Sequence, residues 1–253
     1  MLPGAEGFRH AGAAVGVLLC HGFTGTPQSM GTWPADLAAA GYSVELPLLP
    51  GHGTTWQEMN RTTWQDWYGT VDAALAGLRA DCPTVFVGGL SMGGALALRL
   101  AIEHPQDVAG LVLVNPAVAL EHPLLPALPL VRRIVPSFPG IGSDIKKPGA
   151  VEVTYDRTPL RALASNLAMC ADIRARLASV TQPLLLLRSA EDHVVPASSS
   201  RLILDSVGST DVTEILLEDS YHVATLDNDA ERIVQESLGF ISRISRLSAG
   251  GRR

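Results

Sequence analysis

The stretch Gly89-Leu90-Ser91-Met92-Gly93 reads G-x-S-x-G between two segments of different character. Residues 84–88 are mostly β-branched and aromatic, which predicts a buried parallel strand, and residues 94–104 carry Ala and Leu at helical spacing and stop before a proline. A strand that turns directly into a helix holds the residue between them in a left-handed conformation, and the flanking glycines let the two elements pass closely. We therefore predict that Ser91 is a nucleophile. An idle serine in a glycine-rich turn is the alternative that this motif alone leaves open.

The rest of the chain alternates between apolar runs and amphipathic runs. Strands are predicted at residues 7–10, 15–20, 42–46, 108–114, 183–188 and 212–217. Helices are predicted at about residues 28–40, 62–80, 159–180, 197–207 and 229–247. This alternation predicts an α/β fold with a mostly parallel sheet covered by helices on both faces. Right-handed crossovers place the carboxyl ends of the strands at one edge, where sites collect.

The alternation is interrupted between residues 117 and 158. Six prolines, at positions 123, 126, 129, 136, 139 and 148, divide a segment rich in Leu, Val and Ile. This segment is too apolar for a flexible linker. We predict that residues 1–116 and 159–253 form the core and that residues 117–158 are a small cap inserted over the site.

Composition limits the compartment and the partners. The net charge of -6 in 253 residues disfavours nucleic acid and anionic membrane surfaces as main partners. The odd set Cys20, Cys82 and Cys170 predicts free thiols in a reducing compartment, hence a cytoplasmic protein. No stretch reaches the length of a membrane-spanning helix, so we expect no integral membrane association. No cofactor or metal motif is present, and we expect neither; no feature fixes the oligomeric state.

A serine nucleophile needs a base, and the base needs a carboxylate that orients it. Two later strand ends supply them: Asp192 follows the strand at 183–188, and His222 follows the strand at 212–217. The chain order is therefore serine, acid, histidine. Glu191 is a rival for the acid, because it adjoins Asp192. His193 is too close in sequence to Asp192 to be its partner easily.

Several motifs carry a resemblance to a known family. They are His21-Gly22-Phe23-Thr24-Gly25, Gly51-His52-Gly53-Thr54, Thr63-Trp64-Gln65-Asp66-Trp67, Gly89-Leu90-Ser91-Met92-Gly93, Asp192 with Val195-Pro196, and Ser220-Tyr221-His222-Val223. Together they resemble the α/β-hydrolase fold and, within it, the bacterial carboxylesterase and monoacylglycerol lipase group. The match spans nearly the whole chain except residues 117–158. 

The resemblance implies a serine ester hydrolase that works through an acyl-enzyme, with Ser91, Asp192 and His222 as its triad, and it favours Asp192 over Glu191. It also implies an oxyanion hole formed by the backbone N–H groups of Phe23 and Met92. We expect His21 and His52, which lie in glycine turns, to brace their loops by hydrogen bonding.

The predicted cap supplies the candidate substrate contacts. Its large apolar residues are Leu124, Leu125, Leu128, Leu130, Val131, Ile134, Val135, Phe138 and Ile141. Residues of this kind either line an acyl tunnel, for a monoacylglycerol or a medium-chain acyl ester, or pack the cap onto the core. We take Phe23, Leu125, Ile134, Phe138 and Glu152 as the substrate-binding candidates. Glu152 is a candidate for an alcohol hydroxyl such as that of glycerol, although a solvated surface glutamate is the commoner case.

Other functions remain open at this point. On the same fold, a thioesterase, lactonase, carbon–carbon bond hydrolase or aminopeptidase would use the same residues. Outside catalysis, the fold also serves as a hydrophobic-ligand-binding module. That alternative needs the loss of at least one triad position, and all three candidates are present.

Overall fold

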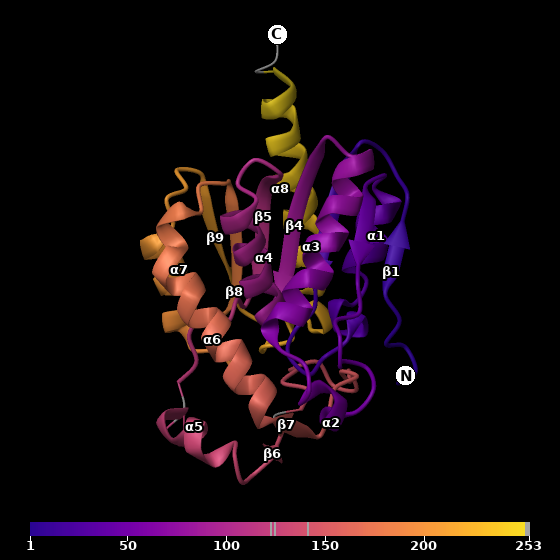
Figure 1. Cartoon of the computed structure of the whole chain (residues 1–253). Helices are drawn as coiled ribbons and strands as arrows, with labels where there is room; N and C mark the ends of the chain where they lie inside the picture. Colours follow the sequence, from indigo (N-terminus) through magenta and orange to yellow (C-terminus); the bar gives the residue numbers. More distant parts are fainter. Residues whose placement is uncertain (122, 124, 141, 251–253) are drawn as a thin grey trace.

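The computed structural model describes residues 1–250 apart from 122, 124 and 141, and the side chains of 248–250 lie outside this description. Its main element is a seven-stranded sheet in the order β1-β3-β2-β4-β5-β8-β9 (Figure 1). The strands are β1 (Phe8–His10), β2 (Val15–Cys20), β3 (Ser43–Leu46), β4 (Thr84–Leu90), β5 (Val108–Val114), β8 (Leu184–Ser189) and β9 (Val212–Leu217). Only β1 pairs antiparallel with its neighbour. The predicted α/β class with a mostly parallel sheet is confirmed.

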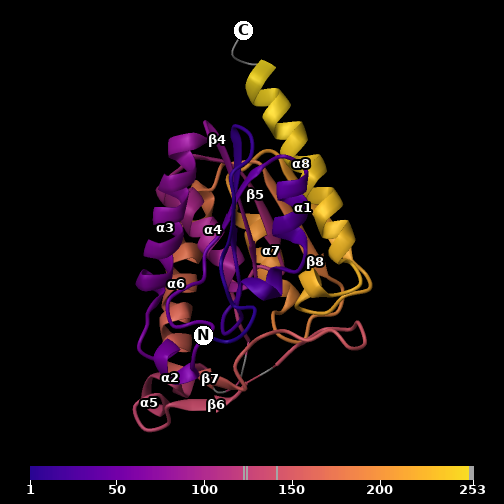
Figure 2. The same ribbon diagram turned by 90° about the vertical axis from the view of Figure 1, so that its right-hand side faces the viewer.

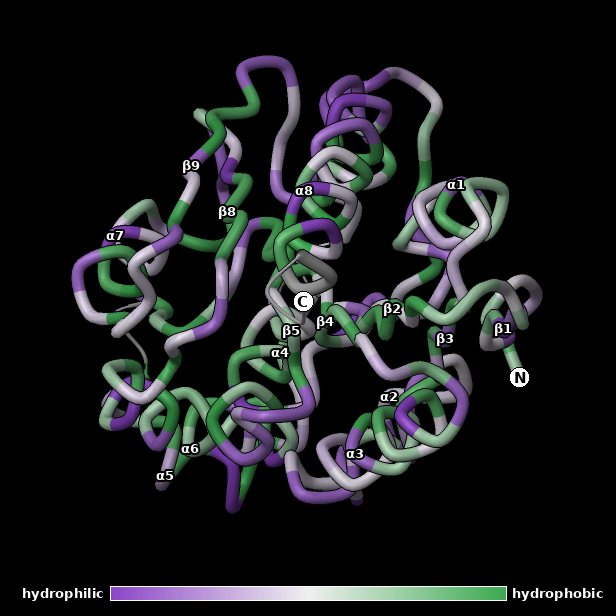
Figure 3. Tube along the Cα trace, turned by 90° about the horizontal axis from the view of Figure 1, so that it is seen from above, coloured by the Kyte–Doolittle hydropathy of each residue, from purple (hydrophilic) through white to green (hydrophobic). Residues whose placement is uncertain are grey.

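Helices cover both faces of this sheet. They are α1 (Trp33–Ala39), α2 (Trp56–Met59), α3 (Trp64–Asp81), α4 (Met92–Glu103), α6 (Leu160–Arg176), α7 (Ala197–Ser206) and α8 (Ala230–Gly250). Figure 2 shows α3, α4 and α6 on one side and α1 and α8 on the other. Two buried apolar clusters, one on each face, hold these layers to the sheet. Seen along the strands in Figure 3, the hydrophobic β4 and β5 lie between the two layers, as a sheet buried on both faces requires.

The turn from β4 to α4 shows why this stretch requires glycine. Ser91 has φ 57°, in the left-handed region. A Cβ atom at Gly93 would lie 1.9 Å from the carbonyl oxygen of Cys20, and one at Gly89 would lie 2.2 Å from the carbonyl carbon of Gly93. Strand and helix therefore touch backbone to backbone, and no larger residue fits at either position.

Local details depart from the predictions. The helix expected at 28–40 is broken into a 3₁₀ turn, η1 (Pro27–Met30), and α1. Gly31 lies between them with φ 59°, and a Cβ there would lie 2.3 Å from the carbonyl oxygen of Thr225. The short α2, which begins after the capping residue Thr55, was not predicted. No helix in the described part of the chain is long and apolar enough to cross a membrane.

The segment between β5 and α6 lies beyond the carboxyl ends of the strands (Figures 1 and 2). It contains η2 (Leu125–Ala127), α5 (Leu128–Val131) and a small antiparallel pair, β6 (Ser137–Pro139) with β7 (Arg157–Pro159). Near its end, the Tyr155 hydroxyl donates to the carbonyl of Gly51 at 2.7 Å and accepts from the N–H of Thr54 at 2.9 Å. The division into a core and a cap stays a prediction.

The close contact at Gly93 gives a stability prediction. Gly93→Ala places a methyl group against the backbone of β2, and we expect a loss of at least about 3 kcal/mol in the free energy of unfolding, measured by urea denaturation. The matched control is Gly77→Ala in α3, where a Cβ atom meets nothing within 4 Å. That substitution removes a helix-interior glycine and should stabilise the protein by about 0.5–1 kcal/mol. Equal stability of the two variants would contradict the assigned contact.

Candidate active site

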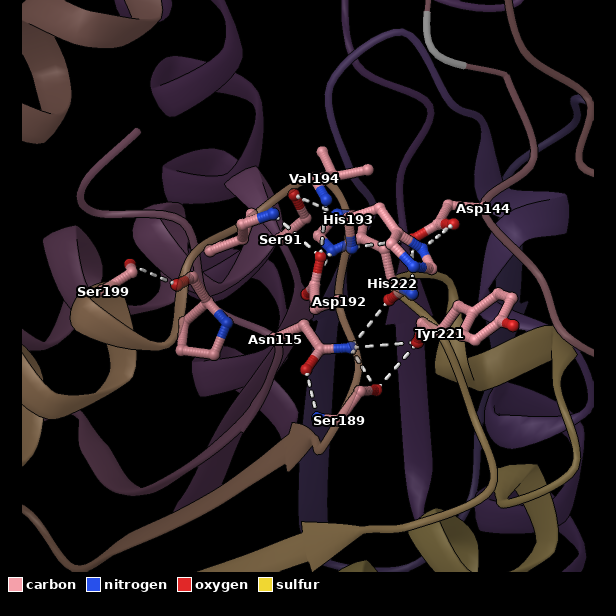
Figure 4. Close-up of polar contacts among 12 residues, drawn as sticks. Ser91, Asn115, Asp144, Ser189, Asp192, His193, Val194, Ser199, Tyr221 and His222 are labelled. Carbon is pink, nitrogen blue, oxygen red and sulfur yellow. Dashed lines mark hydrogen bonds and ion pairs between the residues drawn. The ribbon is translucent and has the colours of Figure 1, made fainter. Parts of the chain in front are cut away.

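Ser91, His222 and Asp192 lie together at the carboxyl ends of β4, β9 and β8 (Figure 4). The Nε2 atom of His222 is 3.0 Å from the Ser91 hydroxyl, and its Nδ1 atom is 2.8 Å from Oδ2 of Asp192. A carboxylate only accepts hydrogen bonds, so Nδ1 carries the proton and the Nε2 lone pair faces the serine. All three residues are buried or nearly so. This arrangement suits removal of the serine proton.

The other carboxylate oxygen of Asp192 accepts from the N–H groups of Val194 and Val195, both at 2.8 Å (Figure 4). Burial alone would raise the pKa of Asp192. The hydrogen bond and charge of His222, with the two N–H donors, outweigh burial and hold the pKa below its ordinary value. The alternative acid, Glu191, instead has its Oε1 atom 3.4 Å from Nε2 of His193. Asp192, not Glu191, is therefore the carboxylate that contacts His222.

Phe23 and Met92, whose backbone N–H groups are the predicted oxyanion-hole donors, line the same cavity as Ser91. Met92 is the first residue of α4, so its N–H lies at the positive end of the helix. Neither N–H donates a hydrogen bond to another described residue. The loop of Phe23 is fixed by Thr24, which has φ 63° and donates its hydroxyl to the Phe23 carbonyl at 2.6 Å. Both N–H groups are therefore free to donate, as the predicted oxyanion hole requires.

Ser91 and His222 open into a cavity of about 380 Å³. One wall is apolar and comes from the segment after β5 and from α6: Leu120, Leu125, Leu128, Phe138, Leu160 and Leu163. Of the substrate-binding candidates, Phe23, Leu125, Phe138 and Glu152 line this cavity. Ile134 does not, because its side chain is 81% exposed on the outer surface. Leu124 and Ile141 lie outside the described residues.

Glu152 is not the solvated surface residue that its type suggests. It is half-buried on the cavity wall, and its carboxylate lies over Gly25, where an added Cβ would be 2.7 Å from Oε1. Burial raises the pKa of Glu152 to about 7, and the charge of His222 opposes this only in part. No described residue donates a hydrogen bond to this carboxylate. Glu152 is thus available to a ligand.

Comparison with known proteins agrees with this geometry. Residues 13–229 match the family described as serine aminopeptidase, S33. The chain belongs to this family of α/β-hydrolases. It is 43% identical to a thermostable monoacylglycerol lipase of Bacillus sp. (strain H-257), over 96% of each chain, and 26% identical to a carboxylesterase of Bacillus subtilis (strain 168), over 94% of this chain and 96% of that one. A solved structure from work on the metagenome-derived lipolytic enzymes LipS and LipT superposes with a TM-score of 0.93 at 45% identity, covering 96% of this chain and 99% of the other. The predicted resemblance is confirmed, and this α/β-hydrolase is a serine hydrolase.

Asn115 is a residue of the site that the sequence did not reveal. It follows β5 with φ 43°, a conformation that asparagine tolerates better than most residues. Its Nδ2 atom donates to the carbonyl of His222 at 2.8 Å and to the Ser189 hydroxyl at 3.0 Å, and its Oδ1 accepts from the Ser189 N–H at 2.7 Å (Figure 4). Asn115 therefore connects the end of β8, which leads to Asp192, with the loop that carries His222. The only sequence signal was its place between an apolar strand and a proline.

Two aspartates tie the segment after β5 to the His222 loop. The Asp144 carboxylate accepts from the N–H of His222 at 3.1 Å and from Nδ1 of His193 at 2.8 Å, and it raises the pKa of His193. Buried Asp227 accepts from the N–H groups of Lys146 at 2.7 Å and Tyr221 at 2.9 Å. The bonds from Asp144 to His222 and from Lys146 to Asp227 join residues about eighty positions apart, so sequence spacing could not predict them.

His21 and His52 brace the neighbouring loops, as predicted. The Nε2 atom of His21 accepts from the N–H of Leu49 at 3.1 Å, and His52 Nδ1 lies 3.2 Å from the carbonyl of Pro50. Both rings are buried. Burial lowers the pKa of His21 to about 4 and holds that of His52 well below its ordinary value. Both rings are therefore neutral parts of the scaffold.

Substitution of Asn115 should reduce turnover more than substrate binding. Asn115→Ala removes the bonds to His222 and Ser189, and we expect kcat to fall about 10- to 100-fold with little change in KM, because small misplacements of reacting groups are costly. Asn115→Gly is the control: it loses the same bonds but relieves the left-handed backbone. We expect it to be more stable than Asn115→Ala in thermal unfolding and equally slow. Recovery of kcat in the glycine variant would assign the effect to backbone strain instead.

The raised pKa of Glu152 predicts a pH-dependent stability difference. Between the ordinary value of 4.5 and about 7, the unfolded chain releases the Glu152 proton while the folded protein keeps it, so stability falls as pH rises through this window. Glu152→Gln cannot titrate. The Tm of the variant minus that of the wild type should therefore increase, by roughly a few degrees, between about pH 4 and about pH 8. The exposed Glu218→Gln is the control, and an equal, pH-independent difference for both variants would refute the assignment.

Proposed function

We propose that this α/β-hydrolase cleaves carboxylic esters, with monoacylglycerols as its main substrates, through a triad of Ser91, His222 and Asp192. The observation that carries the proposal is the Ser91 hydroxyl, which lies 3.0 Å from Nε2 of His222 and lines a cavity together with many apolar side chains. The 43% identity with a Bacillus monoacylglycerol lipase over nearly the full chain supports it.

The reaction proceeds by acyl transfer. His222 Nε2 takes the Ser91 proton while Oγ attacks the ester carbonyl, and the oxyanion that forms accepts from the N–H groups of Phe23 and Met92. His222 then donates this proton to the departing alcohol oxygen, which leaves an ester between Ser91 and the acyl group. A water molecule, deprotonated by His222, attacks the acyl-enzyme and releases the acid. Asp192 stabilises the charged imidazole throughout.

The cavity suits a substrate with one long apolar arm and one polar arm. We place the acyl chain along the apolar wall of Leu125, Phe138 and Leu163, which belongs to the predicted cap and α6. Glu152 lies on the cavity wall near Gly25, and its carboxylate accepts a hydrogen bond from a hydroxyl of the glycerol group. A bare alkyl alcohol would leave this carboxylate without a partner, and that favours glycerol esters over simple alkyl esters.

Peptide hydrolysis is the second candidate, because the matching family is described as serine aminopeptidase. An aminopeptidase needs carboxylates that bind a terminal ammonium group, and Glu152 and Asp144 both line the cavity. Asp144, however, already accepts from two N–H groups and a histidine ring. The apolar wall also suits an acyl chain better than a peptide backbone, which needs hydrogen-bond partners.

The proposal is tested by initial rates on a substrate panel. It comprises 1-monoacylglycerols of increasing chain length, aryl acetates, an acyl thioester and an amino-acid anilide. We expect the highest kcat/KM on medium- or long-chain monoacylglycerols. Ser91→Ala should lower kcat by at least about 10⁴-fold and leave the unfolding transition in place, because only a hydroxyl is removed.

Other outcomes would reject parts of the proposal. A preference for the thioester or the anilide would reject ester hydrolysis as the main activity. A preference for short aryl esters would reject monoacylglycerols. Turnover that survives Ser91→Ala would remove Ser91 from the mechanism, and absence of all Ser91-dependent hydrolysis would favour a ligand-binding module.

A further inference from the structure

Asn166 is a buried polar residue on the wall of the cavity that contains Ser91. It lies in α6, with an exposed fraction of 2%, and lines the cavity together with Leu160 and Leu163 of the same helix. These three positions are three residues apart and therefore follow one side of the helix. The cavity-facing side of α6 thus presents two leucines and then an amide. The two leucines suit an acyl chain, whereas the amide does not.

The side chain of Asn166 has no hydrogen-bond partner among the residues that the structure describes. Its Oδ1 atom is buried and accepts no hydrogen bond, and its Nδ2 atom donates none to the residues that the structure describes. Other buried amides are bonded: Asn115 uses both of its polar atoms, and Gln182 donates to the carbonyl of Ala101 at 3.0 Å. Unpartnered buried polar atoms also occur in five other described side chains, but none of those lines this cavity. Folding alone therefore gives no reason for an amide at this position.

The position of Asn166 is close to the nucleophile. One helical turn further along α6, the Cys170 thiol donates to the carbonyl of Ala117 at 3.2 Å. The N–H of Ala117 in turn donates to the carbonyl of Ser91 at 3.1 Å. This part of α6 is therefore anchored to the Ser91 turn through one residue, and a group held by Asn166 lies inside the substrate-binding region.

The chemistry of the Asn166 amide limits which groups of a ligand it can bind. A carboxamide is neutral and offers both donors and an acceptor, which matches a hydroxyl group. An anionic group is disfavoured because Glu152, Glu121 and Asp144 line the same cavity. We propose that Asn166 binds a free hydroxyl group of the substrate and thereby acts as a specificity-determining residue. This inference rests on the proposed ester hydrolase function and adds a second polar contact to that of Glu152. The hydroxyl belongs either to the alcohol or to an oxygenated acyl chain.

The test measures kcat/KM for matched ester pairs with the wild type and Asn166→Leu, an apolar residue of similar size. The first pair is 1-lauroylglycerol and propyl laurate, which differ only in the hydroxyls of the alcohol. The second compares methyl laurate with methyl laurates hydroxylated at the β, mid-chain and ω carbons. For each pair, we compare the ratio of kcat/KM for the hydroxylated ester to that for the plain ester. We expect Asn166→Leu to lower this ratio about tenfold for one pair, the loss typical of one hydrogen bond.

A lowered ratio in the first pair assigns the hydroxyl to the alcohol, and a lowered ratio in the second assigns it to the acyl chain. The matched control is Leu163→Ala, on the same side of α6, which enlarges the apolar wall and should change both members of a pair by the same factor. If the wild type hydrolyses the esters and Asn166→Leu leaves the ratio unchanged in every pair, the proposed role of Asn166 is overturned, but the proposed ester hydrolase function is not. No hydrolysis of any ester by the wild type would overturn the proposed function as well. Thermal unfolding of Asn166→Leu, which should show no loss of stability, verifies that the variant is folded.

Discussion

The left-handed backbone at Ser91 is the constraint on which the rest of the site depends. With φ 57°, Ser91 raises its hydroxyl above the end of β4 and starts α4 in the same step. This is possible only because Gly89 and Gly93 allow backbone to touch backbone, with Gly93 against the carbonyl of Cys20 in the next strand. The strain is located where the nucleophile must protrude, and the buried layers of the sheet hold it in place. The same turn leaves the N–H of Met92 free at the helix terminus.

A protruding serine is useful only if the base and acid are held to a fraction of an ångström. His222 and Asp192 lie on separate loops after β9 and β8, and loops are mobile unless they are bonded. From the end of β5, Asn115 bonds the end of β8, which leads to Asp192, and the loop of His222, and Asp144 accepts from the N–H of His222. The histidine is therefore held from the sheet and from the segment that covers the cavity. A movement of that segment would be transmitted to His222 directly through Asp144.

The sequence predicts the features that depend on residues near one another in the chain. It does not predict those that depend on contacts between residues far apart in the chain. Strand and helix periodicity, the G-x-S-x-G turn and the order of Ser91, Asp192 and His222 are written along the chain, so the fold and the residues that converge could be named. The break at Gly31 could not, because its cause is the carbonyl of Thr225 far along the chain. The residue type of Glu152 favours a solvated surface position, and its burial could not be predicted because it depends on the path of the loop around it. Ile134 resembled its apolar neighbours, yet it points outward.

The walls of the cavity suggest which substrate features are discriminated most strongly. An apolar wall separates acyl chains that differ by one methylene by only about 1–3 kcal/mol in transition-state free energy. Leu125, Phe138 and Leu163 should therefore favour some chain lengths moderately and exclude few of them. A polar group that is left without a partner discriminates far more sharply, because its desolvation is not recovered. Glu152 and Asn166 both line this cavity, and neither side chain has a hydrogen-bond partner among the described residues. Selectivity in this α/β-hydrolase should therefore follow the hydroxyl groups of the ester more closely than the length of its chain.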